Sequence, residues 1–351
     1  MITLSVCIIV KNNEKNIASF LSSIDRFADE IIVIDLGSSD NTVQIANNYT
    51  SCVASYAFNY DYSAIRNYSL TLCSTDYIMW LDISDSIDEA NIKKILKLKE
   101  TSKNNIDIYM INYDVYSDSS SYCDVTYLRE GLVRLASNPV WKEPVHEYIE
   151  FAGDVFKTDI HIKHMAEKDS EPPYLEIYKK LEEKGEKLSA RSTYYYAKEL
   201  ALHELNKEAI NKYNAFLEME DGFLEDKIAA CFDLSFCQEK IQDYLGMLSS
   251  LLETFQYSVP RAEICCRIGD YFMHYERYEE AIYWFETALN LPKPDSYGLV
   301  QLDYYGYIPH LWLCVLYYQQ GNIEKAKYHN DCAAKIKPDD EAVLYNSELL
   351  K

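Results

Sequence analysis

The 351-residue chain lacks any apolar run of about 18 residues, the length that a membrane-spanning helix needs. It begins Met-Ile-Thr-Leu, without the basic segment and small-residue cleavage site of a signal peptide. Its ten cysteines include no Cys-x-x-Cys pair, a spacing common in zinc and redox sites. We therefore expect a soluble, cytoplasmic protein whose thiols are reduced and mostly buried.

Four common catalytic signatures are also missing. The sequence contains no Gly-x-Gly-x-x-Gly, no Gly-Lys-Ser/Thr loop, no Gly-x-Ser-x-Gly elbow and no His-Glu-x-x-His run. These absences weigh against a Rossmann dehydrogenase, a P-loop NTPase, a serine hydrolase and a zinc protease. Positive charge is scarce, because 34 Lys+Arg stand against 56 Asp+Glu and give a net charge of −22. A nucleic-acid partner is disfavoured, since phosphate binding needs a basic face.

What is present is ordinary globular composition, 48% hydrophobic and 26% charged, in a chain long enough for about two domains. Up to about residue 163, apolar runs alternate with helical patterns. Residues 4–10 form a continuous β-prone run, typical of a strand buried on both faces of a parallel sheet. The same reasoning predicts strands at 31–35, 53–58 and 77–82, and helices at 14–27 and 64–73. This pattern predicts an α/β sheet with right-handed crossovers and a site past the carboxyl ends of its strands.

From about residue 174 the pattern becomes helical and repetitive. Small residues recur among aromatic ones at a spacing of about 34 residues, which is typical of stacked helix–turn–helix units. The units centre on Ala209, Gly246, Ala281 and Ala326, with an insertion at 293–306 before the last. Four such pairs exceed the roughly three that are needed to bury a shared core.

The segment 166–173, Ala-Glu-Lys-Asp-Ser-Glu-Pro-Pro, is the natural boundary between the two patterns. We predict an α/β domain at 1–165, a linker and first helix at 166–190, and an all-α repeat domain at 191–351.

Asp82 and Asp85 form the sharpest acidic feature, on the turn after the strand predicted at 77–82. Two carboxylates three residues apart can converge there on a hard divalent cation, Mg²⁺ or Mn²⁺. Such a cation would neutralise the leaving-group charge of a diphosphate. In the other interpretation, Ser84 or Asp85 caps the helix that begins near Asp88, and the spacing alone leaves both open.

Two further segments carry polar side chains that suit a site. Asp61 or Ser63 can cap a helix whose first turn holds Arg66, and arginine is suited to forked contact with carboxylate or phosphate. Glu147 ends the run Trp-Lys-Glu-Pro-Val-His-Glu, where a Glu or His can act as a general base. Downstream, His164 can complete a metal site. Taken alone, these segments are better explained as a capped surface helix and structural histidines.

Ordered sequence blocks nevertheless run through the first 165 residues. They are residues 5–14, 29–35, 37–42, 61–67 and 80–82, followed by Arg134, residues 141–147 and His164. Taken together these blocks resemble family 2 glycosyltransferases of the GT-A fold. The helical repeats resemble the tetratricopeptide tail of a bacterial subgroup, which includes S-glycosyltransferases that modify bacteriocin peptides.

The resemblance implies a nucleotide-sugar donor, usually UDP-linked. It places Val10, Asn12 and Asp35 around the base or ribose. It places Asp61 and Arg66 along the nucleotide pocket.

The resemblance also matches Asp82 to the first acid of the family's Asp-x-Asp metal motif and His164 to the histidine near the diphosphate. Glu147 is then the candidate base for the acceptor. The subgroup usually reads Asp-Ala-Asp-Glu, whereas Ser84 here replaces the second acid and Asp85 the Glu. A hydroxyl is a much weaker ligand than a carboxylate. We expect Asp85 to take over the metal, because the other pocket positions are all kept.

The leading hypothesis is an inverting glycosyltransferase that moves a sugar from a nucleotide sugar to a peptide or protein acceptor gripped by the repeats, at a Ser, Thr or Cys side chain. Two alternatives stay open. One is an inactive, transferase-like scaffold whose repeats bind a peptide or protein. The other is transfer to a polysaccharide or a lipid-linked glycan. Self-association through the repeats is also open.

Overall fold

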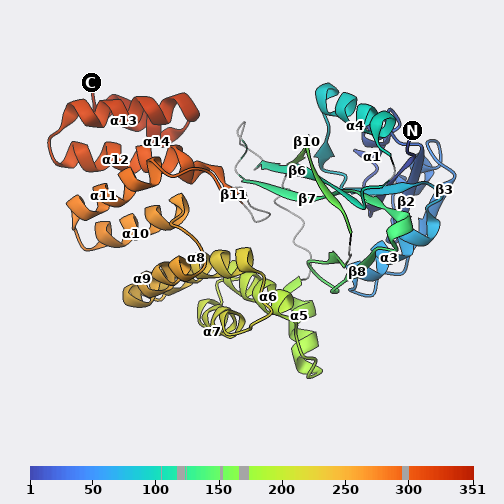
Figure 1. Cartoon of the computed structure of the whole chain (residues 1–351), viewed down its shortest axis with the longest axis horizontal. Coiled ribbons are helices and arrows are strands. Elements are labelled where there is room, and N and C mark those ends of the chain that lie inside the picture. Colours follow the sequence, from blue (N-terminus) through green and yellow to red (C-terminus); the bar gives the residue numbers. More distant parts are fainter. Residues whose placement is uncertain (104, 117–122, 124, 151–152, 166–173, 295–299) are drawn as a thin grey trace. The chain divides into compact units, whose positions relative to one another are not determined.

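The computed structural model describes residues 1–103, 105–116, 123, 125–150, 153–165, 174–294 and 300–351. Its contacts divide the chain into two units, Met1–Pro172 and Pro173–Lys351 (Figure 1). The boundary segment 166–173 lies outside the described residues. The finer domain limits at 165 and 190 therefore stay a prediction.

A mixed sheet forms the centre of the first unit. β1 (Leu4–Val10) pairs in parallel with β2 (Glu30–Asp35) on one side and with β4 (Tyr77–Leu81) on the other. β3 (Cys52–Ser55) continues the parallel part beside β2 and ends earlier than the strand predicted at 53–58. β1 is buried almost throughout, as predicted for a central strand.

The alternating sequence pattern predicted only these parallel strands. The rest of the sheet, which the pattern did not predict, contains both antiparallel and parallel pairs. β7 (Val125–Arg134) runs antiparallel to both β4 and β6 (Ile108–Tyr116). β10 (Val155–Met165) lies parallel to β6, and the short β5 (Asp85–Ser86) pairs with the end of β10. The order along the sheet is β3-β2-β1-β4-β7-β6-β10-β5. A separate hairpin is formed by β8 (Val140–Lys142) and β9 (Tyr148–Glu150).

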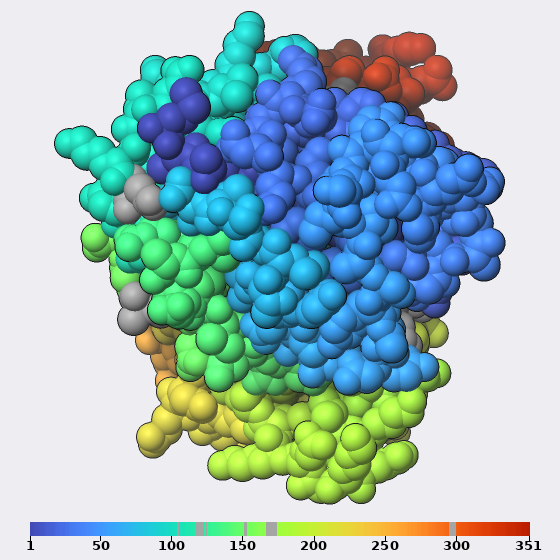
Figure 2. Space-filling model, turned by 90° about the vertical axis from the view of Figure 1, so that its right-hand side faces the viewer, coloured from blue at the N-terminus to red at the C-terminus, as the bar shows by residue number. Residues whose placement is uncertain are grey.

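Helices cover both faces of this sheet. Apolar residues of α1 (Ile17–Ile24), α2 (Thr42–Ala46) and α4 (Glu89–Thr101) belong to the core on one face, and α3 (Tyr62–Leu72) packs on the other. The edge at β3 is turned to the viewer in Figure 2, where blue side chains from the start of the chain form a continuous surface. Because both faces of the sheet are covered by apolar residues, its strands do not show the alternation of polar and apolar residues that is typical of a half-exposed strand.

Helix caps decide one of the alternatives left open by the sequence. The carboxylate of Asp88 accepts the backbone N–H of Asn91 at 2.8 Å and caps α4. The interpretation that made Ser84 or Asp85 this cap is therefore wrong. Asp61 caps α3, because its carboxylate accepts the backbone N–H of Ala64 at 3.0 Å.

The second unit is made of helix pairs, as predicted. After α5 (Tyr174–Glu183), four pairs follow in chain order. They are α6 (Ala190–Leu202) with α7 (Asn206–Leu217), α8 (Leu224–Lys240) with α9 (Tyr244–Glu253), α10 (Ala262–His274) with α11 (Tyr278–Leu289), and α12 (Tyr307–Gln319) with α13 (Ile323–Ile336). α14 (Glu341–Leu349) ends the unit. Residues 295–299 of the predicted insertion lie outside the described part.

Small residues stand where the paired helices approach. A Cβ on Gly269 of α10 would lie 2.8 Å from the ring of Phe285 in α11. Ala209, Ala281 and Ala326 are fully buried. All ten cysteines, each within the described residues, are free thiols, and six of them are buried. None of the described helices combines the length and the apolar character that a membrane crossing requires.

A pair of histidines, the buried His329 and the half-buried His310, joins α12 to α13. The Nδ1 atoms of His310 and His329 lie 2.9 Å apart, so one ring donates to the other. Burial, followed by the neighbouring His310, lowers the pKa of His329 from 6.5 to about 4. The folded protein therefore holds this ring neutral at pH values where an unfolded chain would protonate it.

We expect the free energy of unfolding to fall as the pH drops from 6.5 to 4, because the unfolded state takes up a proton that folded His329 refuses. The gap between the two pKa values corresponds to roughly 3 kcal/mol at most. Denaturant unfolding across this pH range, with hydrogen exchange of α12 and α13, measures the effect. His329→Gln should flatten the slope, whereas His203→Gln, at an exposed helix end, should keep it. An unchanged slope in the His329 variant would contradict the assignment.

Candidate functional site

The loops after β1 and β2 are tied together at the carboxyl edge of the sheet. Asp35, the last residue of β2, is buried, and its carboxylate accepts the N–H of Ser38 at 3.1 Å. Asn12 has a left-handed backbone (φ 56°), and its side-chain oxygen accepts the N–H of Ser39 at 2.8 Å. The carbonyl of Val10 accepts the N–H of the residue that follows Asp35. The structure thus brings together the three residues expected around the base or ribose.

A buried ion pair joins α3 to the residue that precedes β9. The Nε–H of Arg66, in α3, donates to the carboxylate of Glu147, and the two side chains are only 14% and 12% exposed. The guanidinium also lies 4.8 Å from the ring centre of Trp141. Burial raises the pKa of Glu147, but the charge of Arg66 and its hydrogen bond outweigh burial and leave the pKa below its ordinary value. A lowered pKa makes Glu147 a weaker base than the sequence interpretation assumed.

Asp82, Asp85 and His164 form the second part of the site. One potential ligand atom from each lies within 4.8 Å of the others. Asp82 follows β4 and is exposed, whereas Asp85 is buried in β5. β5 pairs with β10 so that Asp85 stands directly opposite His164. This pairing explains how residues 79 positions apart converge.

Tyr113, a residue that no sequence motif singled out, connects this cluster from β6. Its hydroxyl donates to Oδ1 of Asp85 at 2.6 Å and lies 3.4 Å from Oδ2 of Asp82. The hydroxyl is also 2.8 Å from Nδ1 of His164. Burial, reinforced by the charge of Asp85, raises the pKa of Tyr113 far above its ordinary value, so the phenol stays protonated.

The hydrogen bonds of Asp85 fix the orientation of the His164 ring. Nδ1 of His164 lies 2.8 Å from Oδ1 of Asp85, and a carboxylate oxygen only accepts, so Nδ1 carries a proton. Nε2 is then the lone-pair nitrogen of the neutral ring. Burial lowers the pKa of His164, but the hydrogen bond to Asp85 outweighs it and raises the pKa. Oδ2 of Asp85 accepts the N–H of Asp82 at 2.8 Å. These contacts suit an outer carboxylate that orients a histidine ligand.

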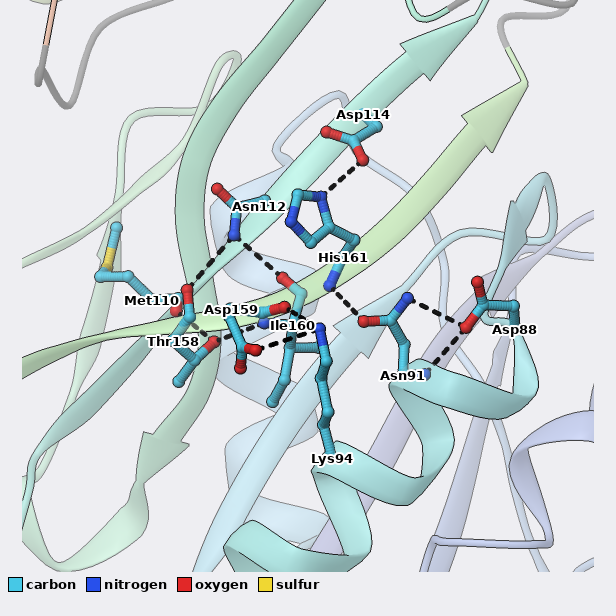
Figure 3. Close-up of polar contacts among 10 residues, drawn as sticks. All are labelled: Asp88, Asn91, Lys94, Met110, Asn112, Asp114, Thr158, Asp159, Ile160 and His161. Atoms are coloured by element: carbon cyan, nitrogen blue, oxygen red, sulfur yellow. Dashed lines mark hydrogen bonds and ion pairs between the residues drawn. The ribbon is translucent and has the colours of Figure 1, made fainter.

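A β-bulge sets the register of β10 just before His164. The pairing of β10 with β6 shifts between Lys157 and His161. Figure 3 shows how the bulge is held: the amide of Asn112 donates to the carbonyls of Thr158 and Ile160, both at 3.2 Å. The N–H of His161 donates to Asn91 of α4 at 2.9 Å, and Lys94 of α4 reaches the carbonyl of Asp159 (Figure 3). A one-residue slip here would turn His164 to the opposite face.

We therefore expect Asn112→Ala to lower the free energy of unfolding by about 1–3 kcal/mol, because two half-buried carbonyls lose their donor. The same change should weaken Mn²⁺ binding by shifting His164. Calorimetry with Mn²⁺ and denaturant unfolding measure the two effects. The control is Asn47→Ala, which removes one exposed hydrogen bond from the side-chain amide of Asn47 to the carbonyl of Val43 in α2. Loss of stability with unchanged Mn²⁺ affinity would contradict a role in placing His164.

Residues 5–153 match the family model described as Glycosyl transferase family 2. The matched segment runs from β1 through β9 and contains every predicted site residue except His164. The first unit is therefore similar to family 2 glycosyltransferases over residues 5–153, and a unit of helical repeats follows it in the chain.

Curated relatives match over short segments. An uncharacterized glycosyltransferase of Rickettsia typhi is 29% identical over 86 residues, which are 24% of this chain and 29% of that protein. A TPR repeat-containing protein of Synechococcus elongatus is 31% identical over 87 residues, 25% of this chain and 22% of that protein. The chain thus spans less than a third of these relatives.

Among solved structures, a thermophilic TPR protein of Thermus thermophilus is 14% identical with a TM-score of 0.37, covering 50% of this chain and 88% of that one. MamA of Desulfovibrio magneticus is 15% identical with a TM-score of 0.36, covering 48% of this chain and 95% of that one.

Proposed function

We propose, starting from the family 2 match of residues 5–153, that the chain is an inverting glycosyltransferase that uses a nucleotide-sugar donor and a peptide or protein acceptor. The observation that carries the proposal is the convergence of Asp82, Asp85 and His164 at the carboxyl end of β4. Ligand sites of α/β sheets lie at such strand ends.

The donor set fits a divalent cation. It combines an exposed carboxylate, Asp82, with the imidazole of His164, and this mixture suits Mn²⁺ better than Mg²⁺, which prefers oxygen. When bound, the cation would neutralise charge on the diphosphate of the donor. Asp85 holds the His164 ring and supports the backbone of Asp82. Asp85 thus has a supporting function in the site, to which the neighbouring Ser84 can contribute only a hydroxyl.

The other pocket residues have distinct tasks in this proposal. Asn12 and Asp35 shape the two loops against which the base and ribose would lie. Arg66 supplies positive charge along the nucleotide pocket. Glu147 holds Arg66 in place, and its lowered pKa makes it a poor acceptor of the proton from the attacking group. We therefore assign Glu147 a positioning role in place of the base role expected from the sequence.

The second unit supports a peptide or protein acceptor. A cavity of about 80 Å³ opens among α6, α8 and α10, lined by Tyr194, Lys198, Asp233, Arg261 and Glu263, among others. A cavity that presents aromatic, acidic and basic side chains on successive repeats can discriminate between peptide side chains.

Calorimetric titration of UDP into metal-stripped protein, with and without Mn²⁺, tests the donor site. We expect binding that requires the metal. A screen of UDP-sugars with a peptide library, read by mass spectrometry, would follow. Absence of binding with UDP, GDP and dTDP would overturn the enzyme assignment in favour of the scaffold. Transfer to glycan acceptors alone would overturn the peptide assignment.

A further inference from the structure

Arg129 places a guanidinium beside the Asp82, Asp85 and His164 cluster. It lies on β7, and its Cζ is 4.5 Å from the ring centre of Tyr113. The register pairs Arg129 with Ile111 and Tyr127 with Tyr113, so these four side chains share one face of the sheet. The hydroxyl of Tyr113 is the atom that contacts the cluster. Arg129 thus packs on the ring whose other end lies in the site.

Arg129 differs from the other arginines of the first unit in its partners. Arg26 pairs with Glu89, Arg66 with Glu147, and Arg134 with Asp107. Within the described part of the chain, Arg129 makes neither a hydrogen bond nor an ion pair, although its side chain is half-buried. Arginine carries five N–H donors in a fixed plane, and those of Arg129 are therefore available to an acceptor from a ligand.

The charges around Arg129 keep it ionised. Burial lowers the pKa of Arg129, but the neighbouring Tyr113 and Tyr127, followed by Asp82 and Asp85, outweigh burial and raise the pKa. Stacking on Tyr113 restricts the orientation of the planar guanidinium of Arg129. A ligand therefore loses less binding free energy to the ordering of this side chain. A stacked, ionised fork with open donors fits an anion with several oxygens, such as a phosphoryl group.

We propose that Arg129 binds the diphosphate of the nucleotide sugar and donates hydrogen bonds to the phosphoryl oxygen that leaves. The inference rests on the proposed function. In the transfer step, the acceptor atom forms a bond to the anomeric carbon and loses its proton to solvent water, the bond from that carbon to the phosphoryl oxygen breaks, and the electron pair of that bond stays on the oxygen. Arg129 stabilises this charge.

Calorimetry with UDP and with uridine, both in the presence of Mn²⁺, tests the proposal on the full chain. Arg129→Gln should weaken UDP binding about 10- to 100-fold and leave uridine binding within about twofold, because only the diphosphate loses charge-assisted hydrogen bonds. Arg129→Lys, which keeps the charge but loses the fork, should lie between. Arg191→Gln is the matched control, since Arg191 also stacks on a tyrosine, Tyr195, but in the second unit.

Two outcomes would overturn the inference alone: UDP affinity unchanged in Arg129→Gln, or UDP and uridine affinity falling by the same factor in both Arg129 variants, which would indicate a structural role. If the unchanged protein binds no nucleoside diphosphate, the proposed function fails and the inference fails with it. Thermal midpoints of all variants show whether a loss of affinity comes from unfolding. If Arg129→Gln is unfolded, the UDP and uridine affinities of Arg129→Lys decide between diphosphate binding and a structural role.

Discussion

Asp82→Ala should reduce sugar transfer on the order of 10³-fold, because the proposed site loses its exposed carboxylate and with it several kcal/mol of charge stabilisation. The thermal midpoint should hardly move. Among the described residues, the hydrogen-bonding contact of the Asp82 carboxylate is a long one, 3.4 Å, with the hydroxyl of Tyr113, so its removal strands no buried partner there. Transfer assays with saturating donor and Mn²⁺, together with thermal unfolding, measure both quantities.

Asp25→Ala is the matched control for this experiment. Asp25 is also an exposed aspartate of the first unit, but it lies at the end of α1, away from the carboxyl ends of the strands. Its replacement should leave transfer unchanged. Full activity in Asp82→Ala would exclude a metal role for this residue, and the match of Asp82 to the Asp-x-Asp motif would then be a likeness in sequence only.

The parts of the site that the sequence predicted are those with short-range causes. The run at 4–10 predicts β1 because a strand covered on both faces has no need of polar residues. Asp35 and Asp82 were predicted at strand ends, where a change from apolar to acidic residues is visible along the chain. Their approach to each other follows from parallel pairing through β1, which brings the carboxyl ends of β2 and β4 to one edge.

Other parts depend on pairings that leave no local signal. Tyr113 and Arg129 reach the site through the antiparallel register of β6 and β7, and no spacing in the sequence specifies that register. Asp85 was predicted as a metal ligand because of its charge. In the structure Asp85 belongs to the cluster with Asp82 and His164, but it is buried with its Oδ1 in contact with Tyr113 and His164, whereas Asp82 is exposed. Burial is decided by the whole fold, so charge alone could not distinguish the two acids.

Glu147→Gln should lower the free energy of unfolding by about 3–5 kcal/mol, because it leaves Arg66 buried without a counter-charge. Replacing both residues together, with Arg66→Met and Glu147→Leu, should restore much of that loss, since an apolar pair needs no compensation. Denaturant unfolding measures both variants. The exposed pair of Arg277 and Glu280 is the control, and Glu280→Gln should cost less than about 1 kcal/mol.

The pH dependence of transfer separates the two roles of Glu147. A general base must lose its proton before it can act, so a catalytic Glu147 would produce an acidic limb in the rate profile that disappears in Glu147→Gln. A residue that holds Arg66 leaves the shape of the profile unchanged and lowers its height, because donor binding suffers at every pH. We expect the second result, since the carboxylate is bound to Arg66 and its pKa lies below the ordinary value. Loss of the limb in a folded variant would return Glu147 to the role of base and leave Arg66 as the group that tunes it.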